Sequence, residues 1–130
     1  MTLAIRTFLL GCALLASLGA SAGEPIPPEA EAVIDQVNAA AKAKDVKALE
    51  ALMVSDRVWG AGGNASAREV LAAWSEKPGV FRQLRDVTRK RCSLREDGLI
   101  VCPNGTNVGL RAGFVSTWRG WKMAFFIAAD

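Results

Sequence analysis

Residues 114–128 read FVSTWRGWKMAFFIA, and this stretch predicts a β-hairpin that turns at Arg119-Gly120. In this register three pairs face each other across the strands: Trp118 with Trp121, Ser116 with Met123, and Phe114 with Phe125. Alternate residues of the second strand then share one face, namely Trp121, Met123, Phe125 and Ile127. Its opposite face is mostly apolar as well, so we expect this strand to be central in its sheet or covered by helices.

The chain before this hairpin predicts helices. Pro28 suits the first turn of a first helix, and Asp45 can cap a short second one. Ser66 and Glu69 form a capping box at the start of a third helix, which Pro78-Gly79 would end. Apolar residues at helical spacing then predict one or two further helical turns: Val80, Phe81, Leu84 and Val87. We therefore expect an α+β fold, with N-terminal helices packed on a curved antiparallel sheet in a small, cone-like arrangement.

Shorter strands are expected between the helices and the last hairpin. Residues 89–94 and 99–102 predict a hairpin through the loop Glu96-Asp97-Gly98. This register places Cys92 and Cys102 opposite each other in a non-hydrogen-bonded pair, so we expect a disulfide between them. Residues 57–59 and 107–110 are further candidates for short strands.

The first 22 residues have the pattern of a secretory signal peptide. Arg6 precedes an apolar run over residues 8–18, and Ala20-Ser21-Ala22 offers a cleavage site. The run is too short for a stable membrane span. An alternative is lipid attachment at Cys12, which would leave a short apolar core before it. We expect cleavage after Ala22, one α+β domain over residues 23–130, and a periplasmic or secreted location.

Charge is unevenly distributed along the chain. One cluster combines one acid, Asp86, with six basic residues: Arg82, Arg85, Arg89, Lys90, Arg91 and Arg95. Such a cluster can attract phosphate, anionic lipid or an acidic protein face, but the interpretation we favour is a solvated surface beside the acidic residues 23–56. No aromatic residue lies within the run 89–91, so a base-stacking platform and a nucleic-acid partner are not indicated.

The chain contains no histidine and no tyrosine. This composition excludes Ser-His-Asp and Cys-His nucleophile systems and histidine metal ligation. We predict no metal site and no cofactor. Any general base would have to be a carboxylate or a lysine. We predict no catalytic residue, because the spacing of Asp35, Asp56 and Asp130 does not indicate the geometry of a general base.

Large aromatic residues are the candidates for a ligand pocket. The set expected to line it is Trp59, Trp74, Phe114, Trp118 and Trp121. The competing interpretation is that these residues fill the core.

Two stretches resemble the nuclear-transport-factor-two-like (SnoaL-like) superfamily. Residues 39–56, with Lys44-Asp45 and then Leu49-x-x-Leu52, look like its opening helices. Residues 119–127, with a glycine turn, Trp121 and then apolar residues, look like its closing strand. The resemblance implies a cone-like sheet around helices with a pocket at its open end. Superfamily members include isomerases, dehydratases, ligand binders and interaction modules, and the Tyr or His and Asp constellations of the catalytic members have no counterpart here.

Three functional hypotheses follow. The first is an exported, non-catalytic domain that binds a small apolar molecule or an envelope protein. The second is a cofactor-free lyase or isomerase of the cone fold with a carboxylate base. The third is an inhibitor or anion-binding protein that uses the basic cluster.

Overall fold

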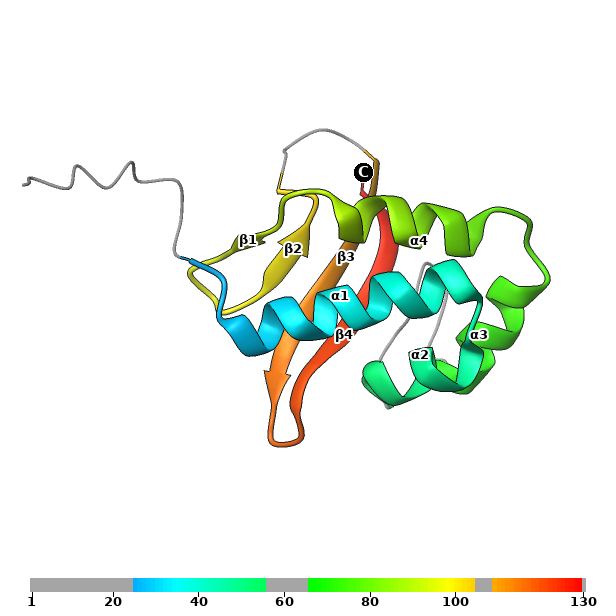
Figure 1. Cartoon of the computed structure of the whole chain (residues 1–130), viewed down its shortest axis with the longest axis horizontal. Helices are drawn as coiled ribbons and strands as arrows, with labels where there is room; N and C mark the ends of the chain where they lie inside the picture. Colours follow the sequence, from blue (N-terminus) through cyan, green and yellow to red (C-terminus); the bar gives the residue numbers. More distant parts are fainter. Residues whose placement is uncertain (1–24, 56–65, 105–108, 130) are drawn as a thin grey trace, which may run out of the picture.

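The computed structural model describes residues 25–55, 66–104 and 109–129. Within these ranges the chain forms four helices and a four-stranded antiparallel sheet, and the first helix runs across one face of the sheet (Figure 1). The α+β class expected from the sequence is confirmed. None of the described helices combines the length and the apolar composition that a membrane crossing requires.

The helices begin where the sequence places their caps. They are α1 (Pro28–Ala43), α2 (Val46–Leu52), α3 (Ala67–Ser75) and α4 (Val80–Arg89). The Asp45 carboxylate accepts a hydrogen bond from the Ala48 N–H at 3.2 Å, and the Ser66 hydroxyl accepts one from the Glu69 N–H at 3.2 Å. Both predicted N-caps are confirmed, and each satisfies a backbone donor that a helix start leaves without a partner.

Helix α4 is longer than the sequence analysis expected. It runs to Arg89, so the strand predicted from that residue begins only at Ser93. Thr88 extends the buried side of the helix, and its hydroxyl donates to the Leu84 carbonyl at 2.8 Å. The Asn38 amide of α1 donates to the Arg85 carbonyl at 2.8 Å and to the Thr88 hydroxyl at 3.1 Å. These bonds join α1 and α4 within an otherwise apolar contact.

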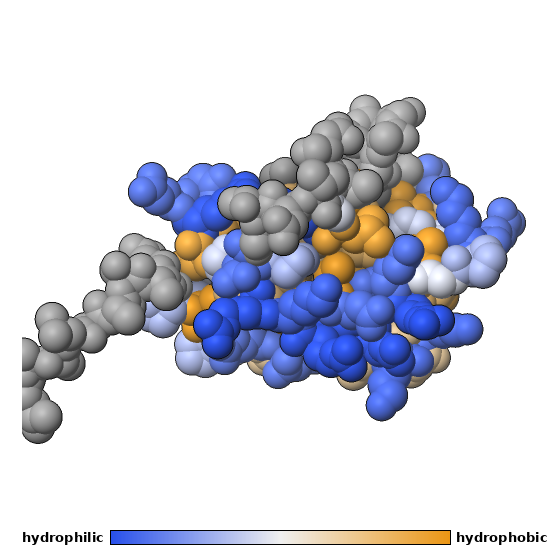
Figure 2. Space-filling view, turned by 90° about the horizontal axis from the view of Figure 1, so that it is seen from above, coloured by the Kyte–Doolittle hydropathy of each residue, from blue (hydrophilic) through white to orange (hydrophobic). Residues whose placement is uncertain are grey.

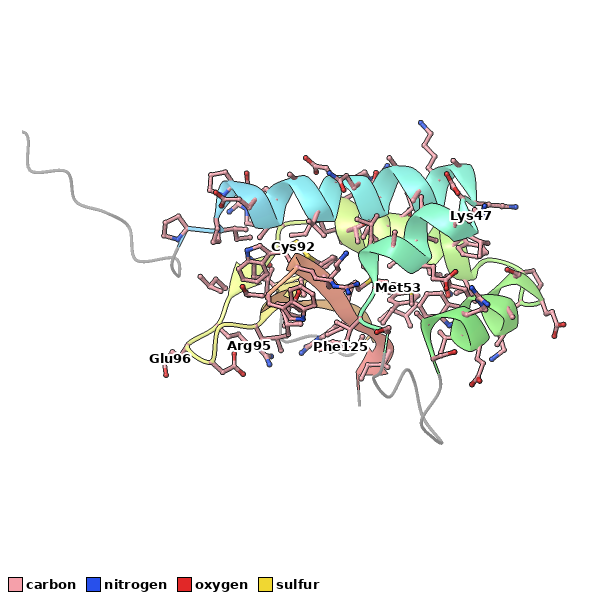
Figure 3. The ribbon with its side chains drawn as sticks, turned by 90° about the horizontal axis from the view of Figure 1, so that it is seen from below. Lys47, Met53, Cys92, Arg95, Glu96 and Phe125 are labelled. Carbon is pink, nitrogen blue, oxygen red and sulfur yellow. A yellow bond between two sulfur atoms is a disulfide. The ribbon has the colours of Figure 1, made fainter. Side chains whose placement is uncertain are left out.

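The sheet has the order β1 (Ser93–Leu94), β2 (Ile100–Cys102), β3 (Gly109–Thr117) and β4 (Gly120–Ala129). The β1–β2 hairpin has the predicted register, since the Arg95 N–H donates to the Leu99 carbonyl at 2.8 Å. Gly98 takes the left-handed conformation at φ 84°. Cys92 and Cys102 form the expected disulfide, with 4.3 Å between their Cα atoms, and Cys92 is labelled in Figure 3.

The β3–β4 register differs from the prediction. Thr117 pairs with Gly120, Ser116 with Trp121 and Phe114 with Met123, so the turn lies at Trp118-Arg119. The predicted turn and the three predicted pairs are therefore wrong. Gly120 has φ 98°, which a glycine directly after a tight turn adopts readily. The Thr117 hydroxyl donates to the Gly120 carbonyl at 2.6 Å and accepts from the Arg119 N–H at 3.2 Å.

A β-bulge in β4 changes which side chains face the helices. Phe114 pairs with Met123 but Gly113 pairs with Phe125, so Ala124 is an extra residue. Met123 and Phe126 both enter the core with the helices, whereas Ile127 is exposed. The predicted common face of Trp121, Met123, Phe125 and Ile127 is wrong for this reason, because one inserted residue reverses the alternation.

Strand β4 ends the sheet order among the described residues and is covered by helices. Both α1 and α2 contact it, and α4 contacts β3. Just after α2 the chain runs beside β4: Met53 forms a parallel bridge with Met123, and the Val54 N–H donates to the Met123 carbonyl at 2.9 Å. The sequence predicted that this strand is either central in its sheet or covered by helices, and the second of these is observed.

On the face of the sheet that points away from the helices, the ring of Phe125 approaches the backbone of Gly113 closely. A Cβ atom added at Gly113 would overlap the ring of Phe125 on the neighbouring strand. Gly113 thus leaves the space that the ring of Phe125, labelled in Figure 3, occupies beside the strand.

We expect Gly113→Ala to lower the free energy of unfolding by about 1–3 kcal/mol, because the added methyl group forces the Phe125 ring out of its position. Urea denaturation measures this change. The matched background is Phe125→Leu, in which the same Gly113→Ala substitution should cost clearly less. If Gly113→Ala lowers the free energy of unfolding equally in both backgrounds, contact with the Phe125 ring is not what requires glycine at this position.

Candidate functional site

The aromatic residues proposed to line one pocket lie in different surroundings. Phe114 is fully buried, and Trp74 packs edge-on against Phe126 with ring centroids 5.5 Å apart. Trp121 is half-buried against the core, whereas Trp118 is 87% exposed at the β3–β4 turn. Trp59 lies outside the described residues. Of the described members, Trp118 is the one that borders the groove found beside the turn.

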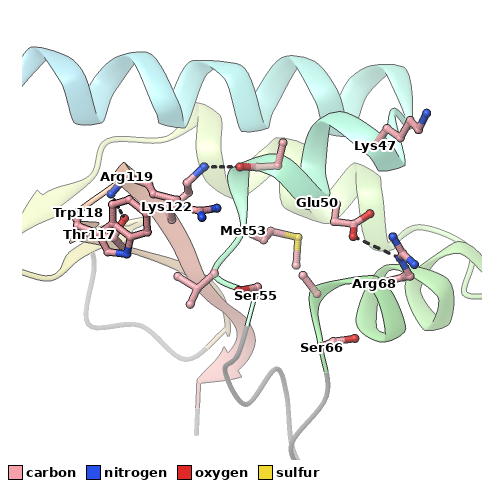
Figure 4. Close-up of a pocket in the computed structure, with 13 residues that line it drawn as sticks. Lys47, Glu50, Met53, Ser55, Ser66, Arg68, Thr117, Trp118, Arg119 and Lys122 are labelled. Carbon is pink, nitrogen blue, oxygen red and sulfur yellow. Dashed lines mark hydrogen bonds and ion pairs between the residues drawn. The ribbon is translucent and has the colours of Figure 1, made fainter.

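This groove lies between the end of α2, the start of α3 and the β3–β4 turn, and its volume is about 960 Å³ (Figure 4). Segments far apart in the sequence supply its lining: Lys47, Glu50, Ala51, Met53, Val54, Ser55, Ser66, Ala67, Arg68, Thr117, Trp118, Arg119 and Lys122. Met53 and Ala67 are almost completely buried and form its apolar base. Figure 4 shows Trp118, Arg119 and Lys122 on one side of Met53, with Glu50 and Arg68 on the other.

Positive charge predominates around the groove. Its charged lining residues are four cations, Lys47, Arg68, Arg119 and Lys122, and a single carboxylate. That carboxylate, Glu50, accepts from the Arg68 Nε–H at 3.3 Å, which ties α2 to α3. Both side chains of this pair reach solvent, so the pair itself adds little stability. The remaining three cations face no acid in the lining of the groove.

Two contacts hold the cations of the hairpin. The Lys122 ammonium donates to the Ala51 carbonyl at the end of α2, so β4 is tied directly to the helix beside the groove. The Arg119 guanidinium carbon lies 4.5 Å from the centroid of the Trp118 ring, in a cation–π arrangement. The two hydrogen bonds of the Thr117 hydroxyl hold the turn that carries Trp118 and Arg119. The rim of the groove is therefore structured although it is exposed.

The basic cluster forms a separate surface on α4 and the chain after it. Arg85 pairs with Asp86 at 3.6 Å, and both side chains are partly exposed. The other five members are exposed and make no ion pair within the described residues: Arg82, Arg89, Lys90, Arg91 and Arg95. Figure 2 shows the molecule from above the view of Figure 1, and hydrophilic residues cover much of this face, with apolar residues between them.

The carboxylates of the described chain lie at the surface. Asp35 is exposed, and no described acidic residue is buried. Asp56 and Asp130 lie outside the described residues. Among the residues described, no three His, Cys, Asp or Glu side chains gather closely enough to hold a metal ion.

The sequence analysis identified Trp118 but missed the charged residues of the groove. Lys47, Arg68 and Lys122 come from three separate elements, and no local spacing connects them. One signal was available in the sequence. Lys122 interrupts an otherwise apolar strand next to the exposed turn, and such a cation needs a polar partner or solvent.

The sequence matches no protein-family model and no curated protein. Among solved structures, the chain is similar to an NTF2-like protein with a cystatin-like fold from Novosphingobium aromaticivorans. The two are 19% identical, the match covers 78% of this chain and 79% of that chain, and the TM-score is 0.43. The resemblance noted in the sequence is to the same superfamily.

Proposed function

We propose that this protein is an exported, non-catalytic domain that binds a small anionic ligand in the groove between α2, α3 and the β3–β4 turn. The observation that carries the proposal is the charge of the lining, which includes four cations and one carboxylate. The sequence alone favoured an apolar small molecule or an envelope protein. The charge of the groove instead favours an anion, supplied by a small molecule or, as the alternative, by an acidic segment of an envelope protein.

The arrangement of the cations suits a ligand larger than a single ion. Each exposed contact between an anion and a cationic side chain contributes only about 0.2–1 kcal/mol, so no one of these cations binds tightly alone. Arg119 and Lys122 lie on one side of the buried Met53, and Arg68 lies on the other. A ligand that reaches both sides would combine their attraction with apolar contact at the base of the groove.

A lyase or isomerase with a carboxylate base receives less support. Such a base has to lie beside the substrate in a site that excludes water, because its proton affinity must be matched to the reaction. Glu50 borders the groove, but its carboxylate is already paired with Arg68 and reaches solvent. A binding function needs none of these conditions.

Export is proposed from the leader pattern of residues 1–22 and is supported by the disulfide. Disulfides persist in oxidising compartments and are rare where thiols are kept reduced. A periplasmic or secreted location is therefore part of the proposal.

The protein recovered from the exported fraction should begin at Gly23 and contain no free thiol. Intact mass spectrometry with and without reduction measures both features, because cleavage after Ala22 removes Cys12 and leaves Cys92 and Cys102 joined. A mass that includes residues 1–22 would contradict the cleavage site. A lipid on Cys12 would support the alternative leader instead.

We expect Arg119→Gln to weaken the binding of inorganic phosphate up to about five-fold, the effect of losing one exposed charge contact. Titration at low ionic strength, followed by the NMR shifts of backbone amides, measures this affinity. Arg82→Gln, which removes the same charge from α4, is the matched control and should leave the groove affinity unchanged. Equal weakening by the two variants, or groove amides that do not shift, would contradict the proposed site.

The basic cluster on α4 supports a second candidate function, the binding of an acidic partner. Five of its six cations make no ion pair within the described residues, so their charge is available to a partner. A surface of this kind attracts polyanions at long range, and dissolved salt screens the attraction.

If this candidate is correct, the protein binds poly-L-glutamate at low salt and releases it as the screening length falls from about 10 Å at 0.1 M to about 3 Å at 1 M salt. Replacing Arg82 and Arg89 with Glu should abolish the binding, as measured by fluorescence anisotropy. The control is the same charge change at Lys42 and Lys77, which lie outside the cluster. Binding that is insensitive to salt would argue against the candidate.

A further inference from the structure

We infer that the ligand of the groove is a planar aromatic anion, an aromatic ring that carries a carboxylate or a comparable anionic group. This inference rests on the proposed function and specifies its ligand class. Three features of the groove carry it: the exposed Trp118 ring, the cations beside that ring, and the apolar base.

Trp118 offers a large aromatic surface that nothing in the described chain covers. It is 87% exposed, whereas the other described tryptophans are partly buried. Large aromatic side chains are favourable to bury and are enriched where proteins bind partners. The turn that carries Trp118 is braced by the Thr117 hydroxyl, so less flexibility is lost when a ring stacks there.

Arg119 determines which charge a ligand stacked on the Trp118 ring can carry. Its guanidinium lies over the Trp118 ring, with 4.5 Å between its central carbon and the ring centroid. A flat ligand that contacts the rest of the indole surface brings its substituents close to this cation. A positively charged substituent would be repelled, whereas an anionic one would pair with the guanidinium.

Lys122 provides a second cation on the same side of the groove. Its ammonium has three N–H donors, and one of them is directed to the Ala51 carbonyl. The remaining donors can bind an anionic group while the bond to α2 holds the side chain in place. Lys122 therefore combines a fixed position with free hydrogen-bonding capacity.

The base of the groove suits a ring rather than a polar chain. Met53 lines it with a thioether side chain, which adapts its shape and makes favourable contacts with aromatic rings. Ala67, a small apolar residue, lines the groove as well. A ligand with its ring between Trp118 and Met53 would have its anionic group near Arg119 and Lys122.

The test uses the exported protein and three probes that separate ring from charge. The probes are naphthalene-2-carboxylate, its uncharged amide, and cyclohexanecarboxylate, which has the charge without an aromatic ring. We expect the naphthalene carboxylate to bind about ten-fold more tightly than either of the others, because it alone combines stacking with the charge contact. Isothermal titration calorimetry measures the affinities, and NMR follows the Trp118 indole N–H and the Met53 methyl signal.

Substitution of Trp118 separates stacking from a general effect on the fold. Trp118→Ala should lower the affinity for naphthalene-2-carboxylate about ten-fold, whereas Trp118→Phe should retain most of it because a ring remains. The exposure of this side chain leads us to expect that both variants fold, and their thermal unfolding midpoints provide the check.

The possible outcomes distinguish this inference from the proposed function. If cyclohexanecarboxylate binds as tightly as the naphthalene carboxylate, or if Trp118→Ala has no effect, the aromatic ligand class is overturned and an anion site remains. If the uncharged amide binds as tightly as the acid, the anion site itself is overturned. Absence of binding by all three probes overturns the inference, and the phosphate titration then decides the proposed function separately.

Discussion

The bulge at Ala124 is the constraint on which the arrangement of this domain depends. An unbroken β4 would place Met123 and Phe125 on the same face, and the helices would meet a different set of side chains. With one inserted residue, Met123 and Phe126 both pack into the core, and Phe125 lies over Gly113 on the other face. The same register places the turn at residues 118–119, which sends Trp118 and Arg119 to the rim of the groove.

Strand β4 also positions the end of α2 that lines the groove. Its Met123 pairs with Met53 just after α2, and its Lys122 donates to the Ala51 carbonyl. The end of α2 is thereby fixed against the sheet, while Glu50 ties α2 to Arg68 of α3. The groove thus lies where the end of α2 is attached to β4 and faces the start of α3. Charges from three elements gather there because those attachments bring the elements together.

Local features were predictable from the sequence, and those that depend on distant contacts were not. The Asp45 and Ser66 caps and the Gly98 turn each depend on a few neighbouring residues, and the Cys92–Cys102 pairing follows from that turn. The β3–β4 register was predicted wrongly because the turn lies at Trp118-Arg119 and not at Arg119-Gly120. Beyond Phe114, nothing within the hairpin sequence marks Ala124 as an inserted residue. The groove was missed for a similar reason, since Lys47, Arg68 and Lys122 meet only after the fold has formed.

Within the described residues, Phe81, Phe114 and Phe126 lie in the apolar core, and Trp118 lies exposed at a cationic groove. The measurement that tests the role of Trp118 most directly is a crystal structure of the protein soaked with naphthalene-2-carboxylate. The account predicts electron density for the ring stacked on Trp118, with the carboxylate near Arg119 and Lys122. Density for the probe at another place, or a groove that holds only water at a saturating probe concentration, would contradict it.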